Sequence, residues 1–119
     1  MTPAQRWLDG YLRAWKSKDP ADVRAIFTDD AEYWFRPDDP EPTRGIDAIV
    51  AMWAEPESPD PQPDLRVLIE DEQLAIIKGT VVDPGHASYS NLWEVYLAPD
   101  GRAHRFVEWY MTPSKPDGN

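Results

Sequence analysis

Residues 89–111 read YSNLWEVYLAPDGRAHRFVEWYM, the stretch that best defines the fold of this chain. Two runs rich in aromatic and branched residues flank Ala98-Pro99-Asp100-Gly101. Proline favours the first corner of a turn, aspartate accepts local backbone hydrogen bonds, and glycine readily adopts a positive φ. The stretch therefore predicts a long antiparallel hairpin.

Neither face of this predicted hairpin is polar. One face carries Tyr89, Asn91, Trp93, Val95 and Leu97 on the first strand and Phe106, Glu108 and Tyr110 on the second. The other carries Ser90, Leu92, Glu94 and Tyr96, then Arg105, Val107, Trp109 and Met111. Because a sheet with one solvated face should alternate cleanly, we expect both faces to be covered, one by helices and the other by a second subunit.

The register of the hairpin stays open at this stage. If Leu97 pairs with Arg102 across a four-residue loop, Asn91 lies opposite Glu108, and a carboxylate and an amide share a face with aromatic rings. A three-residue loop would instead place Leu92 opposite Glu108, and the case for a pocket would weaken.

Composition limits the classes of protein that need considering. A chain of 119 residues is expected to form one domain, residues 1–119. The formal net charge of -10, with no basic stripe, argues against nucleic acid and anionic membranes as partners. The chain has no cysteine, which excludes disulfides and thiolate metal sites. With no recognisable signal peptide or membrane span, a soluble cytoplasmic protein is expected.

The rest of the chain predicts an α+β pattern. Apolar periodicity predicts a helix over residues 3–17, and Asp19-Pro20 opens a short second helix that stops near Thr28. A strand is expected over 30–36. Thr43 or Gly45 should open a third helix, which Pro56 ends. Further expected segments are an exposed loop over 55–64, strands over 65–70 and 74–82, and a turn at 83–85. This order favours helices on one face of a curved antiparallel sheet.

The order and the residues resemble the nuclear transport factor 2-like superfamily, the SnoaL-like or ketosteroid isomerase-like cone fold. The resemblance rests on AWKSKDPADVRAIFTDDAEYWFRP (14–37), TRGIDAIVAMW (43–53) and NLWEVYLAPDGRAHRFVEWYM (91–111). It implies a conical pocket between the curved sheet and the first and third helices, and a homodimer through the outer sheet face. It does not specify the activity, because this fold hosts both enzymes and binding proteins.

Carried over residue by residue, the ketosteroid isomerase pattern matches only in part. The tyrosine that holds the oxyanion in those enzymes, eight residues before a loop aspartate, matches Tyr11 before Asp19. Their general-base aspartate falls on Phe35 and their second aspartate on Trp93. The Asp-Arg-Asp trio of the limonene epoxide hydrolase-like members is not recognisable, and His86 and His104 do not match the scytalone dehydratase-like pattern.

Glu108 and Tyr11 are the candidate catalytic residues. A carboxylate among aromatic rings has its charged form disfavoured, so its pKa should rise toward the range that suits a general acid or base. The alternative is a carboxylate paired with an arginine for architecture alone. The Tyr11 hydroxyl could hold a ligand oxygen, or the ring could simply fill the core.

The aromatic side chains of the pocket face are the candidate ligand-binding residues. These residues are Tyr33, Phe35, Trp53, Tyr89, Trp93, Phe106 and Tyr110. The polar Asn91 joins them, because it could orient a ligand carbonyl or satisfy Glu108. No metal site or cofactor is expected, because the two histidines lack a carboxylate-rich ligand set.

Two functions therefore remain open from the sequence. One is a cofactor-independent enzyme that transfers a proton on a small, mostly apolar molecule, by isomerisation, aldol cyclisation or dehydration. In that reading Glu108 moves the proton while Tyr11 and Asn91 hold the oxyanion. The other is a non-catalytic module that binds an apolar molecule or whose cone is filled by side chains.

Overall fold

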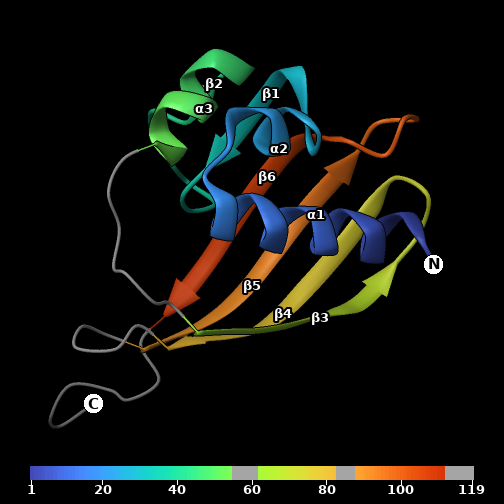
Figure 1. The fold of residues 1–119 in the computed structure, drawn as a ribbon. Helices are drawn as coiled ribbons and strands as arrows, with labels where there is room; N and C mark the ends of the chain where they lie inside the picture. Colours follow the sequence, from blue (N-terminus) through green and yellow to red (C-terminus); the bar gives the residue numbers. More distant parts are fainter. Residues whose placement is uncertain (55–61, 83–87, 112–119) are drawn as a thin grey trace, which may run out of the picture.

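The computed structural model describes residues 1–54, 62–82 and 88–111. Its elements follow in the order α1 (Pro3–Ser17), α2 (Pro20–Arg24), β1 (Phe27–Trp34), β2 (Thr43–Arg44), α3 (Ile46–Trp53), β3 (Gln62–Glu70), β4 (Leu74–Val82), β5 (Ser88–Leu97) and β6 (Ala103–Met111). The strands form one six-stranded sheet in the order β2-β1-β6-β5-β4-β3. Figure 1 shows α1 lying along the concave face of this sheet, with α2 and α3 at the β1 end. The predicted α+β cone is confirmed.

One pair of neighbouring strands differs from the expected antiparallel pattern. β1 runs parallel to β6, with Tyr33 beside Phe106, whereas the other pairs are antiparallel. The sheet is therefore mixed. The parallel pair is possible because α3, β3, β4 and β5 all intervene in the chain between the two strands, which gives the crossover the length it needs.

Helix α1 is the element that closes the concave face. Thr2 caps its N-terminus by accepting a hydrogen bond from the Gln5 N–H at 3.1 Å, and Pro3 occupies the first turn. Its buried residues recur at helical spacing and point at the sheet: Ala4, Trp7, Leu8, Tyr11 and Ala14. The predicted helix over residues 3–17 is confirmed.

The segment after α1 differs in its bounds from the prediction. Asp19 caps α2 as expected, but the helix ends at Arg24, and Phe27 already belongs to β1. The Trp7 indole N–H donates to the Ile26 carbonyl at 2.8 Å, which ties this junction to α1. Fully buried Phe27 fits either element by hydrophobicity alone, and tertiary packing selects the strand.

The later elements match the predictions more closely. Gly45, at φ 86°, is the N-cap of α3, and the unpredicted strand β2 precedes it. β4 matches the predicted strand, while β3 begins at Gln62, inside the predicted 55–64 loop. Residues 55–61 of that loop lie outside the described residues. The predicted turn at 83–85 and His86 lie outside them too.

The hairpin forms with a register that neither sequence alternative gave. Leu97 pairs with Ala103, but Tyr96 pairs with Arg105, so His104 is an extra residue in a β-bulge. The bulge shifts the pairing until Trp93, rather than Asn91 or Leu92, lies opposite Glu108. The shift from the four-residue alternative is two residues, so the predicted pocket face is retained.

The core is a continuous aromatic and aliphatic cluster between α1 and the sheet. Phe106 lies at its centre, fully buried, with its ring stacked on Tyr33 at 4.5 Å and tilted against Trp93 at 5.2 Å between ring centroids. In the part of the chain that the structure describes, no helix has the length and apolar character needed to cross a membrane.

Candidate functional site

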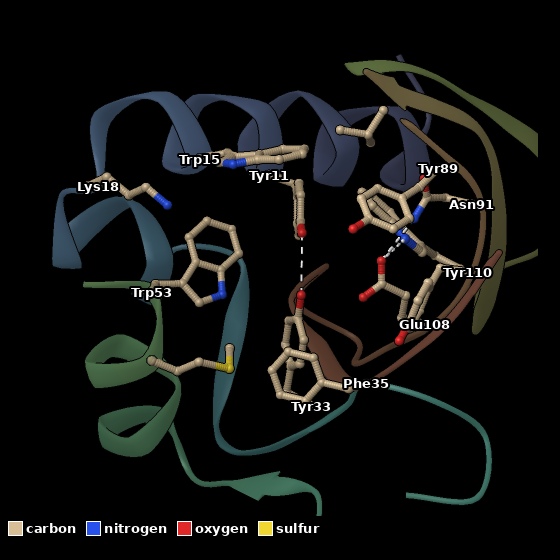
Figure 2. A pocket seen from close by; sticks show the side chains of 13 residues that line it. Tyr11, Trp15, Lys18, Tyr33, Phe35, Trp53, Tyr89, Asn91, Glu108 and Tyr110 are labelled. Carbon is tan, nitrogen blue, oxygen red and sulfur yellow. Dashed lines mark hydrogen bonds between the residues drawn. The ribbon is translucent and has the colours of Figure 1, made fainter. Parts of the chain in front are cut away.

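A cavity of about 490 Å³ opens between α1, α3 and the concave side of β5 and β6 (Figure 2). Its walls come from separate elements: Tyr11, Trp15 and Lys18 at the α1 end, Tyr33 and Phe35 at the end of β1, Met52 and Trp53 on α3, Val81 on β4, Tyr89, Asn91 and Trp93 on β5, and Glu108 and Tyr110 on β6. Most of this wall is aromatic, so the cavity suits a small molecule with ring surface.

The structure brings nearly all of the predicted site residues to this one cavity. Both candidate catalytic residues line it, as do seven of the eight candidate ligand-binding residues: Tyr33, Phe35, Trp53, Tyr89, Asn91, Trp93 and Tyr110. Phe106 is the exception. It lies behind the wall and supports the rings of Tyr11 and Tyr33 instead of facing the open space.

Four further residues line the cavity without having been predicted. Trp15 could have been predicted from the sequence, because it lies on the same helical face as Tyr11. Met52 and Val81 had no such signal beyond membership of a helix and a strand. Lys18 was hidden because it follows the last turn of α1, where a lysine is ordinarily read as a solvated cation.

Glu108 is the one carboxylate among the described residues that line the cavity. A single oxygen, Oε2, accepts hydrogen bonds from Asn91 Nδ2 at 2.9 Å and from Trp93 Nε1 at 3.4 Å. The other oxygen accepts none from the described part of the chain, and Figure 2 shows it projecting toward Tyr33. Glu108 is therefore held through one oxygen while the second faces the cavity.

The surroundings of Glu108 favour its neutral form. Burial raises the pKa of Glu108 above its ordinary value, and the hydrogen bonds from Trp93 and Asn91 oppose that rise only in part. No arginine is among its partners in the described chain, so the architectural pairing weighed from the sequence does not occur there. A carboxyl group in this state can exchange a proton with a ligand closer to neutral pH than an exposed one can.

Of the two roles considered for Asn91, orienting a ligand carbonyl or satisfying Glu108, the geometry supports the contact with Glu108. Its Nδ2 donates to Glu108, so it positions the carboxylate rather than presenting that donor to a ligand. Its Oδ1 is buried without a hydrogen-bond partner in the described part of the chain. Asn91 is thus a positioning residue for Glu108, and the oxyanion role considered for it has no support from this geometry.

Tyr11 and Tyr33 place two phenol groups at the middle of the cavity. Their hydroxyl oxygens lie 3.4 Å apart, one from α1 and one from β1, and both residues are buried. The Tyr11 ring is fixed by Trp93 at 4.7 Å and Trp53 at 5.0 Å between ring centroids. A ligand oxygen near this pair could accept hydrogen bonds from both hydroxyls.

His104 is the one histidine in the described part of the chain, and it lies away from the cavity. It occupies the bulge at the far end of the hairpin, beside Tyr96. Among residues 1–54, 62–82 and 88–111, no group of three or more His, Asp or Glu side chains is arranged to hold a metal ion.

Comparisons with known proteins agree with this architecture. The family model of the SnoaL-like domain matches residues 8–112. No curated protein matches the sequence. A solved NTF-2 like protein from Burkholderia xenovorans LB400 is similar with a TM-score of 0.75 and 16% identity, covering 98% of this chain and 88% of that one.

Two further solved structures carry isomerase names. A protein from Kribbella flavida, provisionally named a ketosteroid isomerase, has a TM-score of 0.77 at 15% identity, covering 98% of this chain and 84% of that one. A steroid delta-isomerase from Pseudomonas aeruginosa has a TM-score of 0.67 at 14% identity, covering 95% and 82%. At such low identity the likeness shows the fold alone, and the activity has to be inferred from the residues of the site.

Proposed function

The chain belongs to the SnoaL-like domain family, and we propose that its aromatic cavity binds a small, mostly apolar molecule on which Glu108 transfers a proton without a cofactor. The observation that carries the proposal is the arrangement of Glu108. One oxygen is held by two donors and the other faces an aromatic cavity of about 490 Å³. The isomerase names of two structural neighbours are consistent with this chemistry but do not specify it.

The chemistry follows from the positions of Glu108 and the tyrosine pair. An ionised Glu108 would take a proton from a carbon next to a ligand carbonyl, and the C–H electrons would move to the carbonyl oxygen as an enolate forms. Tyr11 and Tyr33 would donate hydrogen bonds to that oxygen. Glu108, now protonated, would return the proton to another carbon in isomerisation, to a leaving hydroxyl in dehydration, or, in aldol cyclisation, to the alkoxide that forms when the enolate carbon attacks a second carbonyl. Isomerisation, aldol cyclisation and dehydration all share this first step.

Binding measured by tryptophan fluorescence tests the proposal. Trp53 and Trp93 lie in the cavity wall and should report the entry of steroids, polyketide fragments or aromatic ketones. The panel is repeated on Glu108→Gln and on Glu94→Gln, a matched control on the opposite face of the same hairpin. Saturable binding that changes with Glu108→Gln and not with Glu94→Gln supports the proposal. Turnover assays on that ligand class are then the next step.

A non-catalytic binding module is the second candidate, because the positions that match the ketosteroid isomerase aspartates hold apolar rings. Phe35 and Trp93 stand there, and Trp93 is only 1% exposed. This candidate predicts saturable binding that is unaffected by Glu108→Gln. An absence of binding across the whole panel would argue against both candidates and for a purely structural cone.

We also propose a homodimer through the outer face of the sheet. That face exposes Ile69 (65%), Trp109 (48%) and Met111 (68%). Its central carboxylate, Glu94, already accepts hydrogen bonds from Tyr96 at 2.6 Å and Trp109 at 2.5 Å, so burying it costs less than burying a bare charge. A second copy of the same face is a chemically matching partner, because a two-fold dimer places the same apolar patch of each subunit against the other.

Sedimentation velocity tests the dimer. Trp109→Ala should shift the equilibrium toward monomer, because it removes a large apolar side chain from the proposed interface. The adjacent Tyr110→Ala is the matched control, since Tyr110 is similarly exposed (56%) but lies at the cavity side of β6. A wild-type chain that is monomeric at all concentrations would contradict the proposal.

A further inference from the structure

Lys18 is the one cation among the described residues that line the cavity. It follows α1 in the left-handed conformation, at φ 58°, a position that glycine or asparagine usually occupies. No other non-glycine residue in the described chain has a positive φ. Lysine has no conformational advantage there, so the backbone alone does not explain this residue.

The side chain of Lys18 lies over an aromatic wall and is not fully exposed to solvent. Its ammonium group is 5.7 Å from the centroid of the Trp53 ring, within the range of a cation–π contact. The residue is half-buried, although surface lysines ordinarily extend into water. Figure 2 shows the amino group on the Trp53 side of the cavity, across the tyrosine pair from Glu108.

The cavity is therefore polar at two ends and aromatic between them. Glu108 stands at one end, Lys18 at the other, and the Tyr11–Tyr33 hydroxyl pair lies between. The chain as a whole carries a net charge of -10, a field that works against binding an anion. A cation directed into the cavity opposes that field locally, at the point where a ligand would meet it.

From this arrangement, and resting on the proposed binding function, we propose that Lys18 is a specificity residue that selects ligands carrying an anionic oxygen group, such as a carboxylate, on an apolar ring body. The ring lies against the aromatic wall and its carboxylate pairs with the Lys18 ammonium group over Trp53. The substrate class is thus a carbonyl compound whose aromatic or alicyclic ring body also carries an anionic group such as a carboxylate, rather than an uncharged one.

A structural role for Lys18 makes a different prediction. A cation at the end of a helix stabilises the helix dipole, and the contact with Trp53 adds packing. In that case substitution would lower the melting temperature and leave the charge preference of the cavity unchanged. The two roles are therefore separated by comparing the affinities of two ligands of the same shape and different charge.

The test is isothermal titration calorimetry at low ionic strength with 2-naphthoate and its uncharged analogue 2-naphthamide. Wild type should bind the acid roughly five- to tenfold more tightly than the amide. Lys18→Met should abolish that preference while amide affinity stays within about twofold, since the apolar wall is intact. Lys18→Arg should keep the preference, because it keeps the charge.

Two further variants complete the design. Lys16→Met, in the last turn of α1 and outside the cavity wall, removes the same charge and should keep the preference. Lys18→Gly suits the left-handed backbone and replaces Lys18→Met if the latter does not fold. Equal binding of acid and amide by wild type, or a preference that survives both Lys18→Met and Lys18→Gly, overturns this inference while leaving the binding function standing. If neither naphthalene binds, this inference is overturned, whereas the binding function is decided separately by the panel of steroids, polyketide fragments and aromatic ketones.

Discussion

Two glutamates on the same hairpin, Glu108 and Glu94, show how the two faces of the sheet differ. Each accepts a hydrogen bond from a tryptophan indole and another from a neighbouring polar group. On the outer face, Tyr96 binds one oxygen of Glu94 and Trp109 binds the other. On the concave face, both donors bind the same oxygen of Glu108.

The difference lies in the distribution of the donors and not in the residue types. Glu94 has both oxygens satisfied by its own strands, which leaves little for a ligand to bind. Glu108 keeps one oxygen directed at a cavity, and burial raises its pKa. Similar local sequences, a glutamate near a tryptophan, thus produce an architectural carboxylate on one face and a candidate acid–base group on the other.

The largest expected difference between the two faces is in turnover. On any ligand that the protein converts, Glu108→Gln should lower kcat/KM by about 100-fold or more, because the amide cannot exchange the proton. Glu94→Gln should stay within about twofold, since Glu94 faces away from the cavity. Steady-state kinetics on the two variants checks this. Equal losses would mean that the hairpin acts only as a scaffold.

Removing a hydroxyl should produce the next largest difference. Tyr11→Phe should weaken binding of an aromatic ketone by about tenfold, the value of one hydrogen bond to a buried oxygen. Tyr96→Phe removes a hydroxyl from the outer face and should leave the ketone affinity unchanged. Fluorescence titration measures both. A Tyr11→Phe variant that binds the ketone as tightly as wild type would show that the Tyr11 hydroxyl does not bind the ligand oxygen.

The pH dependence of stability should distinguish Glu108 from the outer-face Glu32. Folding favours protonated Glu108, so the stability it contributes below the ordinary pKa of 4.5 is lost as pH rises through its raised folded pKa. The pKa of Glu32 is lowered by hydrogen bonds from Trp34, Arg44 and Arg105 against the opposing effect of burial. Its contribution is therefore present above pH 4.5 and is lost as pH falls through its folded value.

Urea unfolding from pH 3 to 8 on wild type, Glu108→Gln and Glu32→Gln measures these opposite trends. Relative to Glu108→Gln, wild type should lose stability as the pH rises above about 4.5. Relative to Glu32→Gln, wild type should lose stability as the pH falls below about 4.5. Parallel trends for the two variants would contradict the electrostatic difference between the faces.

The smallest expected effect is on the titration of Glu108 itself. Trp93→Phe removes an indole donor that favours the charged carboxylate, so the pKa of Glu108 should rise further. Trp109→Phe removes the equivalent donor from Glu94 and should leave the Glu108 titration where it was. The pH midpoint of ligand binding reports the shift. An unchanged midpoint in Trp93→Phe would show that the 3.4 Å contact contributes little.

Sequence reasoning predicted the fold well where the pattern is local. The helical spacing of Trp7 and Tyr11 and the Asp19-Pro20 start signal each specify structure within a few residues. It missed the parallel pairing of β1 with β6, which depends on contacts between residues about seventy positions apart. It also missed the bulge at His104, since one extra residue leaves no signature in an alternating strand.

The site was predicted largely because face alternation is periodic. The four-residue register placed Asn91, Trp93 and Glu108 on one face, and the observed two-residue shift preserves that face. Phe106 lies on the same face but is fully buried behind the cavity wall. Alternation shows which face a side chain is on, whereas its depth depends on the curvature of the sheet. Lys18 could not be predicted as a cavity residue, because the direction of its side chain follows from its own left-handed backbone conformation after α1.

A titration of the glutamate carboxyl groups by ¹³C NMR, with Glu108 assigned from the Glu108→Gln spectrum, tests the central claim most directly. The account predicts that Glu108 titrates above 4.5 while Glu32 titrates below it in the same sample. It also predicts that a bound aromatic ligand shifts the Glu108 midpoint and leaves that of Glu32 unchanged. A Glu108 midpoint at or below 4.5 that does not respond to a bound ligand would contradict a role for Glu108 in proton transfer.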